Sequence, residues 1–196
     1  MTVAQVKKPP YPTDRLITGE ELGEHPEWGY VELKRGKVVP VAPPKRPHGS
    51  IVARMSPVLS QYEKSHGGEV ITGDSGVYTE RNPDTVRGPD IYFVGAERVK
   101  EAQTDGYLEI PPDLCVEVIS PTDRTRNLAE KVEECLAIGV KLIWVIDPVK
   151  KTAHVYRKGR EPKVVDKNGA LDGEDVLPQF TLGLNELFST GGRTFS

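Results

Sequence analysis

Two apolar runs joined by an amphipathic segment constrain the fold of this chain more than any other feature. Residues 114–119 (Leu-Cys-Val-Glu-Val-Ile) and 141–146 (Lys-Leu-Ile-Trp-Val-Ile) are nearly continuous apolar runs, which is typical of strands buried on both faces. The segment 126–138 between them has helical periodicity, and Gly139 fits its C-cap. A strand, a helix and a strand in this order predict a parallel pair joined by a right-handed crossover. We therefore expect an α/β fold with a mixed β-sheet flanked by helices.

One carboxylate, Glu117, interrupts the first apolar run. Removing an ionised carboxylate from water costs several kcal/mol unless the group is paired or binds a cation. Cys115 and Ile119, which share its face of the strand, can do neither. Glu117 is therefore either half of a buried salt bridge or a metal ligand or general base, and the residues alone leave both open.

Lys131 is the natural partner of Glu117. With about 100° per residue, Lys131 lies within the apolar arc that also holds Leu128 and Cys135, so it faces the sheet. Two misplaced charges that can neutralise each other are more informative than either alone. The alternative is a lysine at the edge of the apolar stripe whose stem reaches out to water.

Two further acids are candidates for the same site. Asp90 follows Gly88-Pro89 and opens the strand expected at 90–94, and two carboxylates at neighbouring strand ends would suit Mg²⁺. Glu32 breaks an apolar alternation in the first hairpin, so it either reaches this site or is an exposed glutamate. His48, which precedes a helix start, has the pattern of a surface or capping residue.

The remaining elements follow from local patterns. Thr18 and Glu21 predict a capped short helix, and Pro57 is expected to kink or interrupt the helix over 48–66. The other expected elements are a hairpin of 30–33 and 37–41, a proline-rich loop over 43–47, strands at 69–72 and 76–79, a loop between 79 and 90, an edge strand at 153–157, and a strand near 177–180 followed by a capping helix. We divide the chain into an N-terminal arm (1–17), a single domain (18–190) and a C-terminal tail (191–196).

Composition excludes several classes of protein. No apolar run is long enough to span a membrane, and the N-terminus has no secretory signal, so we expect a cytoplasmic protein with no membrane partner. The two cysteines, Cys115 and Cys135, have neither disulfide-framework nor zinc-site spacing and predict buried thiols. The net charge of −3 does not favour nucleic-acid binding by bulk electrostatics, so a DNA partner would need a local basic patch or a metal ion.

Several short motifs, in this order and spacing, resemble the Uma-two family of restriction endonucleases, which have a PD-(D/E)XK nuclease-like fold. They are Arg-Gly-Pro-Asp-Ile at 87–91, Pro-Pro-Asp-Leu-Cys-Val-Glu-Val-Ile-Ser-Pro at 111–121, Lys131, Gly-Val at 139–140 and Trp-Val-Ile-Asp-Pro at 144–148. The similarity runs from about Thr18 to Phe188 and includes the hairpin that carries Glu32. It implies a restriction-endonuclease-like core with an N-terminal β-hairpin extension.

The resemblance also implies roles for individual residues. Asp90 matches the acid of the Pro-Asp motif, and Glu117 matches the acid of the (D/E)XK half-motif. Ile119 stands where that motif places its lysine, and Lys131 resembles a lysine relocated to the following helix. Asp90 and Glu117 would hold Mg²⁺ (or Mn²⁺) together with a backbone carbonyl near Val118. Lys131 would position or deprotonate water, and Glu32 would add a ligand or base.

Two hypotheses about function follow. The first is a Mg²⁺-dependent endonuclease that hydrolyses phosphodiester bonds of DNA and acts as a homodimer, since enzymes that cut both strands usually pair two sites. The second is a catalytically inactive nuclease fold that serves as a binding or assembly module, because a fold alone does not establish function. If Glu117 is present for function, its replacement by alanine should raise the melting temperature. If Glu117 is a structural partner of Lys131, the same change should lower it.

Overall fold

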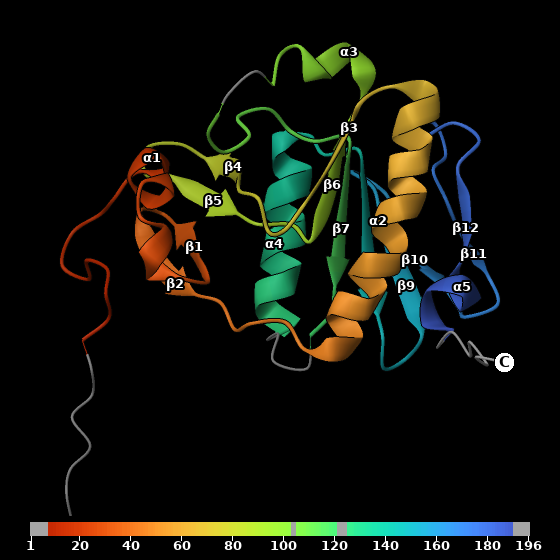
Figure 1. Ribbon diagram of the computed structural model, residues 1–196, viewed down its shortest axis with the longest axis horizontal. Helices are drawn as coiled ribbons and strands as arrows, with labels where there is room; N and C mark the ends of the chain where they lie inside the picture. The colour runs from red at the N-terminus through yellow and green to blue at the C-terminus, as the bar shows by residue number, and fades with distance from the viewer. Residues whose placement is uncertain (1–7, 103–104, 121–124, 190–196) are drawn as a thin grey trace, which may run out of the picture.

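The computed structural model of the chain describes residues 8–102, 105–120 and 125–189, which form three β-sheets and the helices around them (Figure 1). The larger sheet has six strands in the order β10-β9-β8-β7-β6-β3. Their bounds are β3 Glu69–Thr72, β6 Ile91–Val94, β7 Leu114–Val118, β8 Leu142–Asp147, β9 Thr152–Tyr156 and β10 Lys163–Val165. Only β7 and β8 pair in parallel, and the other neighbours in this sheet are antiparallel. The sheet is therefore mixed, as predicted.

A smaller sheet of four antiparallel strands, in the order β2-β1-β5-β4, forms the other end of the molecule (Figure 1). Its strands are β1 Val31–Lys34, β2 Lys37–Pro40, β4 Val77–Glu80 and β5 Thr85–Arg87. The predicted hairpin is confirmed: Arg35 and Gly36 both have positive φ, as a two-residue turn that matches the strand twist requires. A third, two-stranded sheet pairs β11 (Ala170–Asp172) with β12 (Thr181–Gly183).

The helices cover both faces of the large sheet. They are α1 Gly19–Gly23, α2 Arg46–His66, α3 Ala96–Val99, α4 Thr125–Ile138, α5 Leu184–Phe188 and a short 3₁₀ helix at Pro26–Trp28. Alternate residues of β6 and β7 contribute to two apolar clusters, one containing α2 and α5 residues and the other containing α4 residues. Cys115 on β7 belongs to the cluster that contains α4 residues. Glu117, two positions further along the strand, therefore lies on the same side of the sheet.

Several local predictions are confirmed. Thr18 caps α1 by accepting a hydrogen bond from the Glu21 N–H (3.2 Å). Gly139 has positive φ just after α4, and the Val140 N–H returns to the Cys135 carbonyl at 3.0 Å. Both cysteines are buried free thiols. Among the described residues, no helix is both long and apolar enough to cross a membrane.

Other boundaries were wrong, for identifiable reasons. Helix α2 begins at Arg46, not after the prolines, because Pro47 lies in its first turn, where a missing N–H removes no hydrogen bond. Pro57 does not end this helix. The loop expected between residues 79 and 90 contains β5, a three-residue strand.

Two expectations about the C-terminal part also need correction. Strand β9 is not an edge strand, because β10 pairs with it. Residues 177–180 form a turn in place of a strand: the Phe180 N–H bonds to the Leu177 carbonyl and Gln179 has positive φ. The strand lies just beyond, at β12. The predicted tail 191–196 and residues 1–7 of the predicted arm lie outside the described residues.

Candidate active site

Glu117 and Lys131 form a buried ion pair between β7 and α4. The Lys131 Nζ lies 2.8 Å from Glu117 Oε1 and 3.0 Å from Oε2. It also donates a hydrogen bond to the Gly88 carbonyl at 2.7 Å. The helical-wheel prediction that Lys131 faces the sheet is thus confirmed. Glu117 Oε1, though within ion-pair distance, accepts no well-directed hydrogen bond from a described residue and has acceptor capacity left.

Asp90 lies beside this pair, just before β6 begins. Its Oδ2 accepts a hydrogen bond from the Val118 N–H at 2.5 Å, which places the Asp90 carboxylate next to the residue that follows Glu117. Its Oδ1 lies 2.9 Å from Nε2 of His48, which comes from the first turn of α2. Asp90 is therefore held by two elements that are distant in the sequence.

Glu32 reaches the same place from the hairpin. Its Oε1 lies 3.4 Å from Lys131 Nζ and accepts a hydrogen bond from the Gly88 N–H at 3.1 Å. Its Oε2 is 2.9 Å from the Arg87 guanidinium, which is 1% exposed and also binds both carboxylate oxygens of Glu134 on α4. The hairpin, β5 and α4 thus meet around one buried arginine.

Several of these side chains line one cleft of about 850 Å³. Its lining includes Glu32, Asp90, Glu117 and Lys131, together with His48 and Asp74. At Gly88 the chain passes so close to Asp74 that a Cβ would lie 2.6 Å from the Asp74 carbonyl oxygen. A residue with a side chain at position 88 would therefore displace the loop that carries Asp74.

Carboxylates outnumber cations in this cleft. Burial raises the pKa of Glu117 well above its usual value, Lys131 opposes this shift, and the nearby Asp90 adds to it. Burial and Asp90 likewise raise the pKa of Asp74. Burial by itself would lower the pKa of Lys131, but the charges of Glu117 and Glu32 outweigh it and raise that pKa. Lys131 is therefore held as an ammonium ion.

Glu32 behaves differently from Glu117. Burial opposes its ionisation, but the charges of Lys131 and Arg87 outweigh that effect and lower the pKa of Glu32. Glu32 is therefore a carboxylate at neutral pH that balances two buried cations.

The donor set fits a hard divalent cation. Two carboxylates, Asp90 and Glu117, meet at one end of the cleft, and oxygen donors are the ligands that Mg²⁺ prefers. Within the part of the chain that the structure describes, no three His, Cys, Asp or Glu side chains form a preformed metal cage. Mg²⁺ does not need one, because it is usually held by one or two carboxylates plus waters and substrate phosphates.

Sequence reasoning missed the part played by three residues. His48 is not a surface or capping residue: it is buried against Asp90. Arg87 and Asp74 were not singled out as site residues. Burial of Arg87 within β5 has no signal in the sequence once that strand is taken for a loop. His48 could have been suspected from its place on the apolar face of α2, shared with Ile51 and Met55.

Comparisons with known proteins identify a family and a fold. A family model named Uma2, described as "Putative restriction endonuclease", matches residues 20–185. Among solved structures, a "putative nuclease belonging to DUF820" from Anabaena variabilis ATCC 29413 superposes with a TM-score of 0.70 at 22% identity, covering 81% of this chain and 89% of that chain. No curated protein matches. The similarity to the solved structure shows that the chain has the restriction-endonuclease-like fold.

Proposed function

The chain belongs to the Uma2 family of restriction-endonuclease-like proteins, and from this premise we propose that it is an endonuclease that hydrolyses phosphodiester bonds of DNA with Mg²⁺ or Mn²⁺. The observation that carries the proposal is the convergence of Asp90, Glu117 and Lys131 on one cleft from three separate elements. Burying several carboxylates together with an ammonium ion is costly for a fold that has no use for them.

Asp90 and Glu117 would hold the metal ion, with the backbone carbonyl of Val118 as a further donor. The contact of Val118 with Asp90 is made by its N–H, so the role of its carbonyl stays a prediction. A bound divalent cation would stabilise negative charge on the phosphate and lower the pKa of a bound water.

Lys131 positions the attacking water and stabilises developing negative charge. Its raised pKa keeps it protonated, which favours these roles over deprotonation of the water. Glu32 also holds the ammonium group, because it contacts Lys131 and is itself held by Arg87. His48 orients Asp90 through its contact with Oδ1.

The test is cleavage of supercoiled plasmid in Mg²⁺ or Mn²⁺ by the wild type and by the Asp90→Ala, Glu117→Ala and Lys131→Ala variants. Glu69→Gln, which changes an exposed glutamate on β3, is the matched control. We expect cleavage by the wild type and the control only, and none in EDTA. Cleavage that survives in the three site variants would contradict the proposal.

One observation favours the alternative of an inactive binding or assembly module. Asp90, Glu117 and Lys131 already have protein partners, so the cluster is internally balanced to a considerable degree. Wild-type protein that binds DNA in the plasmid assay but leaves it intact with either metal would support that module. The homodimer and the cytoplasmic location stay predictions of the sequence.

A further inference from the structure

We propose that the cleft binds a strand with unpaired bases, and that Tyr30 stacks on a base beside the carboxylate cluster. This inference rests on the proposed nuclease function and specifies its substrate as single-stranded or locally unpaired nucleic acid. Tyr30, Val41 and Pro44 line the same cleft as Glu117 and Lys131. The cleft therefore has an apolar part next to its charged part.

The backbone of Tyr30 is held at the open end of the hairpin. The Val41 N–H donates to the Tyr30 carbonyl at 2.9 Å, which continues the β1–β2 ladder by one pair beyond Val31 and Pro40. Tyr30 lies just before β1, two residues before Glu32, and both residues line the cleft. An aromatic ring thus lines the same cleft as the carboxylate that contacts Lys131.

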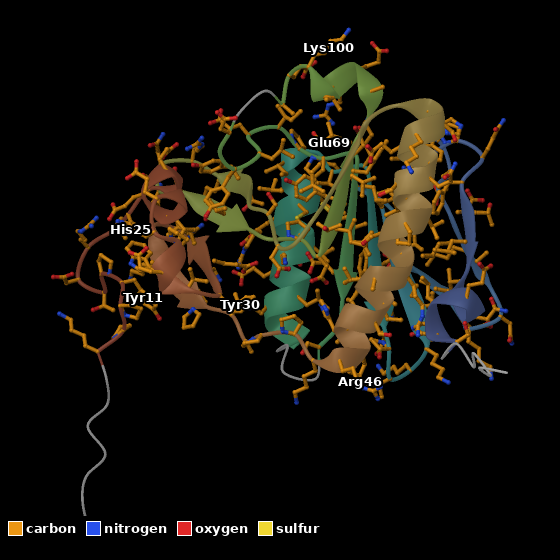
Figure 2. The ribbon with its side chains drawn as sticks, in the orientation of Figure 1. Tyr11, His25, Tyr30, Arg46, Glu69 and Lys100 are labelled. Carbon is orange, nitrogen blue, oxygen red and sulfur yellow. The ribbon has the colours of Figure 1, made fainter. Side chains whose placement is uncertain are left out.

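The Tyr30 ring is not part of the apolar core, so packing does not explain why an aromatic residue stands at this position. Tyr30 is 57% exposed and Val41 is 39% exposed, and both belong to the small set of large apolar side chains that the described part of the chain leaves open to solvent. Figure 2 shows Tyr30 with His25 and Tyr11 at the end of the molecule formed by the smaller sheet. In Figure 1 the segment from β2 to α2, which carries Val41 and Pro44, passes the end of α4 where that helix begins. Tyr30, Val41 and Pro44 therefore give the cleft apolar side chains in addition to its charged ones.

The charges of the cleft argue against recognition of duplex DNA by its phosphates. Of the lysines in the lining, Lys34 is paired with Glu130 at 2.5 Å and Lys131 with Glu117. Acidic side chains in the lining outnumber these lysines. Duplex binding depends on basic side chains that neutralise many phosphates. Stacking on aromatic rings contributes about 1–3 kcal/mol per base and requires unpaired bases, so it can supply affinity for a single strand that the paired lysines do not.

The experiment measures binding and cleavage separately. Binding of a short fluorescent single-stranded oligonucleotide and of the matching duplex is followed by anisotropy in Ca²⁺, for the wild type, Tyr30→Ala, Tyr30→Phe and Val164→Ala. Val164 is exposed on β10 and does not line this cleft, so its replacement is the matched control. Cleavage of the same two probes is then measured in Mg²⁺ or Mn²⁺.

We expect the wild type to bind and cut the single strand in preference to the duplex. Tyr30→Ala should weaken single-strand binding about tenfold or more, while Tyr30→Phe and Val164→Ala stay close to wild type. Equal binding of both probes, or single-strand binding unchanged in Tyr30→Ala, would overturn this inference even if cleavage is observed. Single-strand binding that depends on Tyr30, without cleavage in either metal, would support the stacking site and contradict the nuclease proposal.

Discussion

At the scale of single residues, Lys131 and Glu117 form a buried ion pair whose two members have unequal partners. Lys131 contacts Glu117, Glu32 and the Gly88 carbonyl. Glu117 has Lys131 as its cationic contact among the described residues. Removing the lysine therefore leaves Glu117 without a cation and Glu32 with Arg87, whereas removing the glutamate leaves the lysine with Glu32.

We predict that Lys131→Ala destabilises the metal-free protein more than Glu117→Ala does. The lysine variant should lose about 3–5 kcal/mol of unfolding free energy, the usual cost of leaving a buried charge unpaired. The glutamate variant should lose clearly less unfolding free energy. Burial raises the pKa of Glu117 in the wild type, so the ionised form of this side chain is already disfavoured there. Urea unfolding in EDTA measures both. A larger loss in Glu117→Ala would show that this carboxylate is primarily structural.

The residue scale is also where the sequence was most informative. Glu117 and Lys131 could be predicted because each contradicts a local pattern, one an apolar strand and the other an apolar helix face. Their roles in metal binding and water activation stay predictions. The burial of His48 could be suspected from the apolar face of its helix, but its contact with Asp90 could not be predicted, because that contact joins residues 42 positions apart (90 − 48).

At the scale of elements, Arg87 connects the smaller sheet to α4. Its guanidinium contacts Glu32 on β1 and Glu134 on α4 while lying on β5. Glu32 in turn contacts Lys131, so this arginine supports the position of the site from outside it. We regard Arg87 as a positioning residue.

Arg87→Met should cost about 3–5 kcal/mol of unfolding free energy, since it leaves two carboxylates without their buried partner. Arg35→Met is the matched control, because Arg35 makes an exposed pair with Glu80 at 3.4 Å that should be worth about 0–1 kcal/mol. Urea unfolding of both variants checks the contrast. Similar losses in the two variants would mean that the ion pairs of Arg87 stabilise the fold no more than the exposed Arg35–Glu80 pair does.

Ionisation of Asp113 makes the stability of the fold depend on pH. It accepts a hydrogen bond from the Gly95 N–H (2.8 Å) and pairs with Arg98 and Lys141. Burial would raise the pKa of Asp113, but these partners outweigh it and lower that pKa. Its stabilising contribution is therefore complete above the unfolded pKa of about 3.9 and is lost as the pH falls through the lower, folded value.

We expect Asp113→Asn to lower the melting temperature at neutral pH, and the difference from wild type to shrink below about pH 4. Thermal unfolding followed by circular dichroism between neutral and acidic pH measures this. A difference that stays constant over that range would show that ionisation of Asp113 contributes nothing to stability.

Elements with strong local signals were predictable, and those defined by distant partners were not. The parallel pair β7–β8 follows from two apolar runs and the helix between them. Strand β5 could not be recognised, because its three residues include a buried arginine that forms a strand only through pairing with β1 and β4. Likewise, β9 appeared to be an edge strand because the pairing of β10 has no local signature.

At the scale of the whole molecule, the site lies where the smaller sheet meets the large one. Neither the order β2-β1-β5-β4 nor its position against α4 could be derived from the sequence, since both depend on pairings between distant segments. The net charge of −3 also belongs to this scale. It means that any nucleic acid is attracted by local contacts and a metal ion, not by the overall field.

Single-strand binding should therefore depend weakly on salt. Between 50 and 200 mM salt, we expect affinity to fall less than about tenfold, against about 10³–10⁵ for proteins that make 6–10 phosphate contacts. Anisotropy titrations with the single-stranded oligonucleotide in Ca²⁺ measure the slope. A loss of about 10³-fold would show that phosphate contacts dominate and that stacking on Tyr30 is secondary.

The most direct test of the metal-dependent site is a calorimetric titration of Mn²⁺ into metal-free protein, with and without the oligonucleotide. It compares the wild type with Asp90→Ala and Glu117→Gln. We predict saturable binding by the wild type, tighter with the oligonucleotide because its phosphates complete the coordination, and none by either variant. The same heats in all three proteins, or no binding by the wild type even with oligonucleotide, would contradict a metal site built on Asp90 and Glu117.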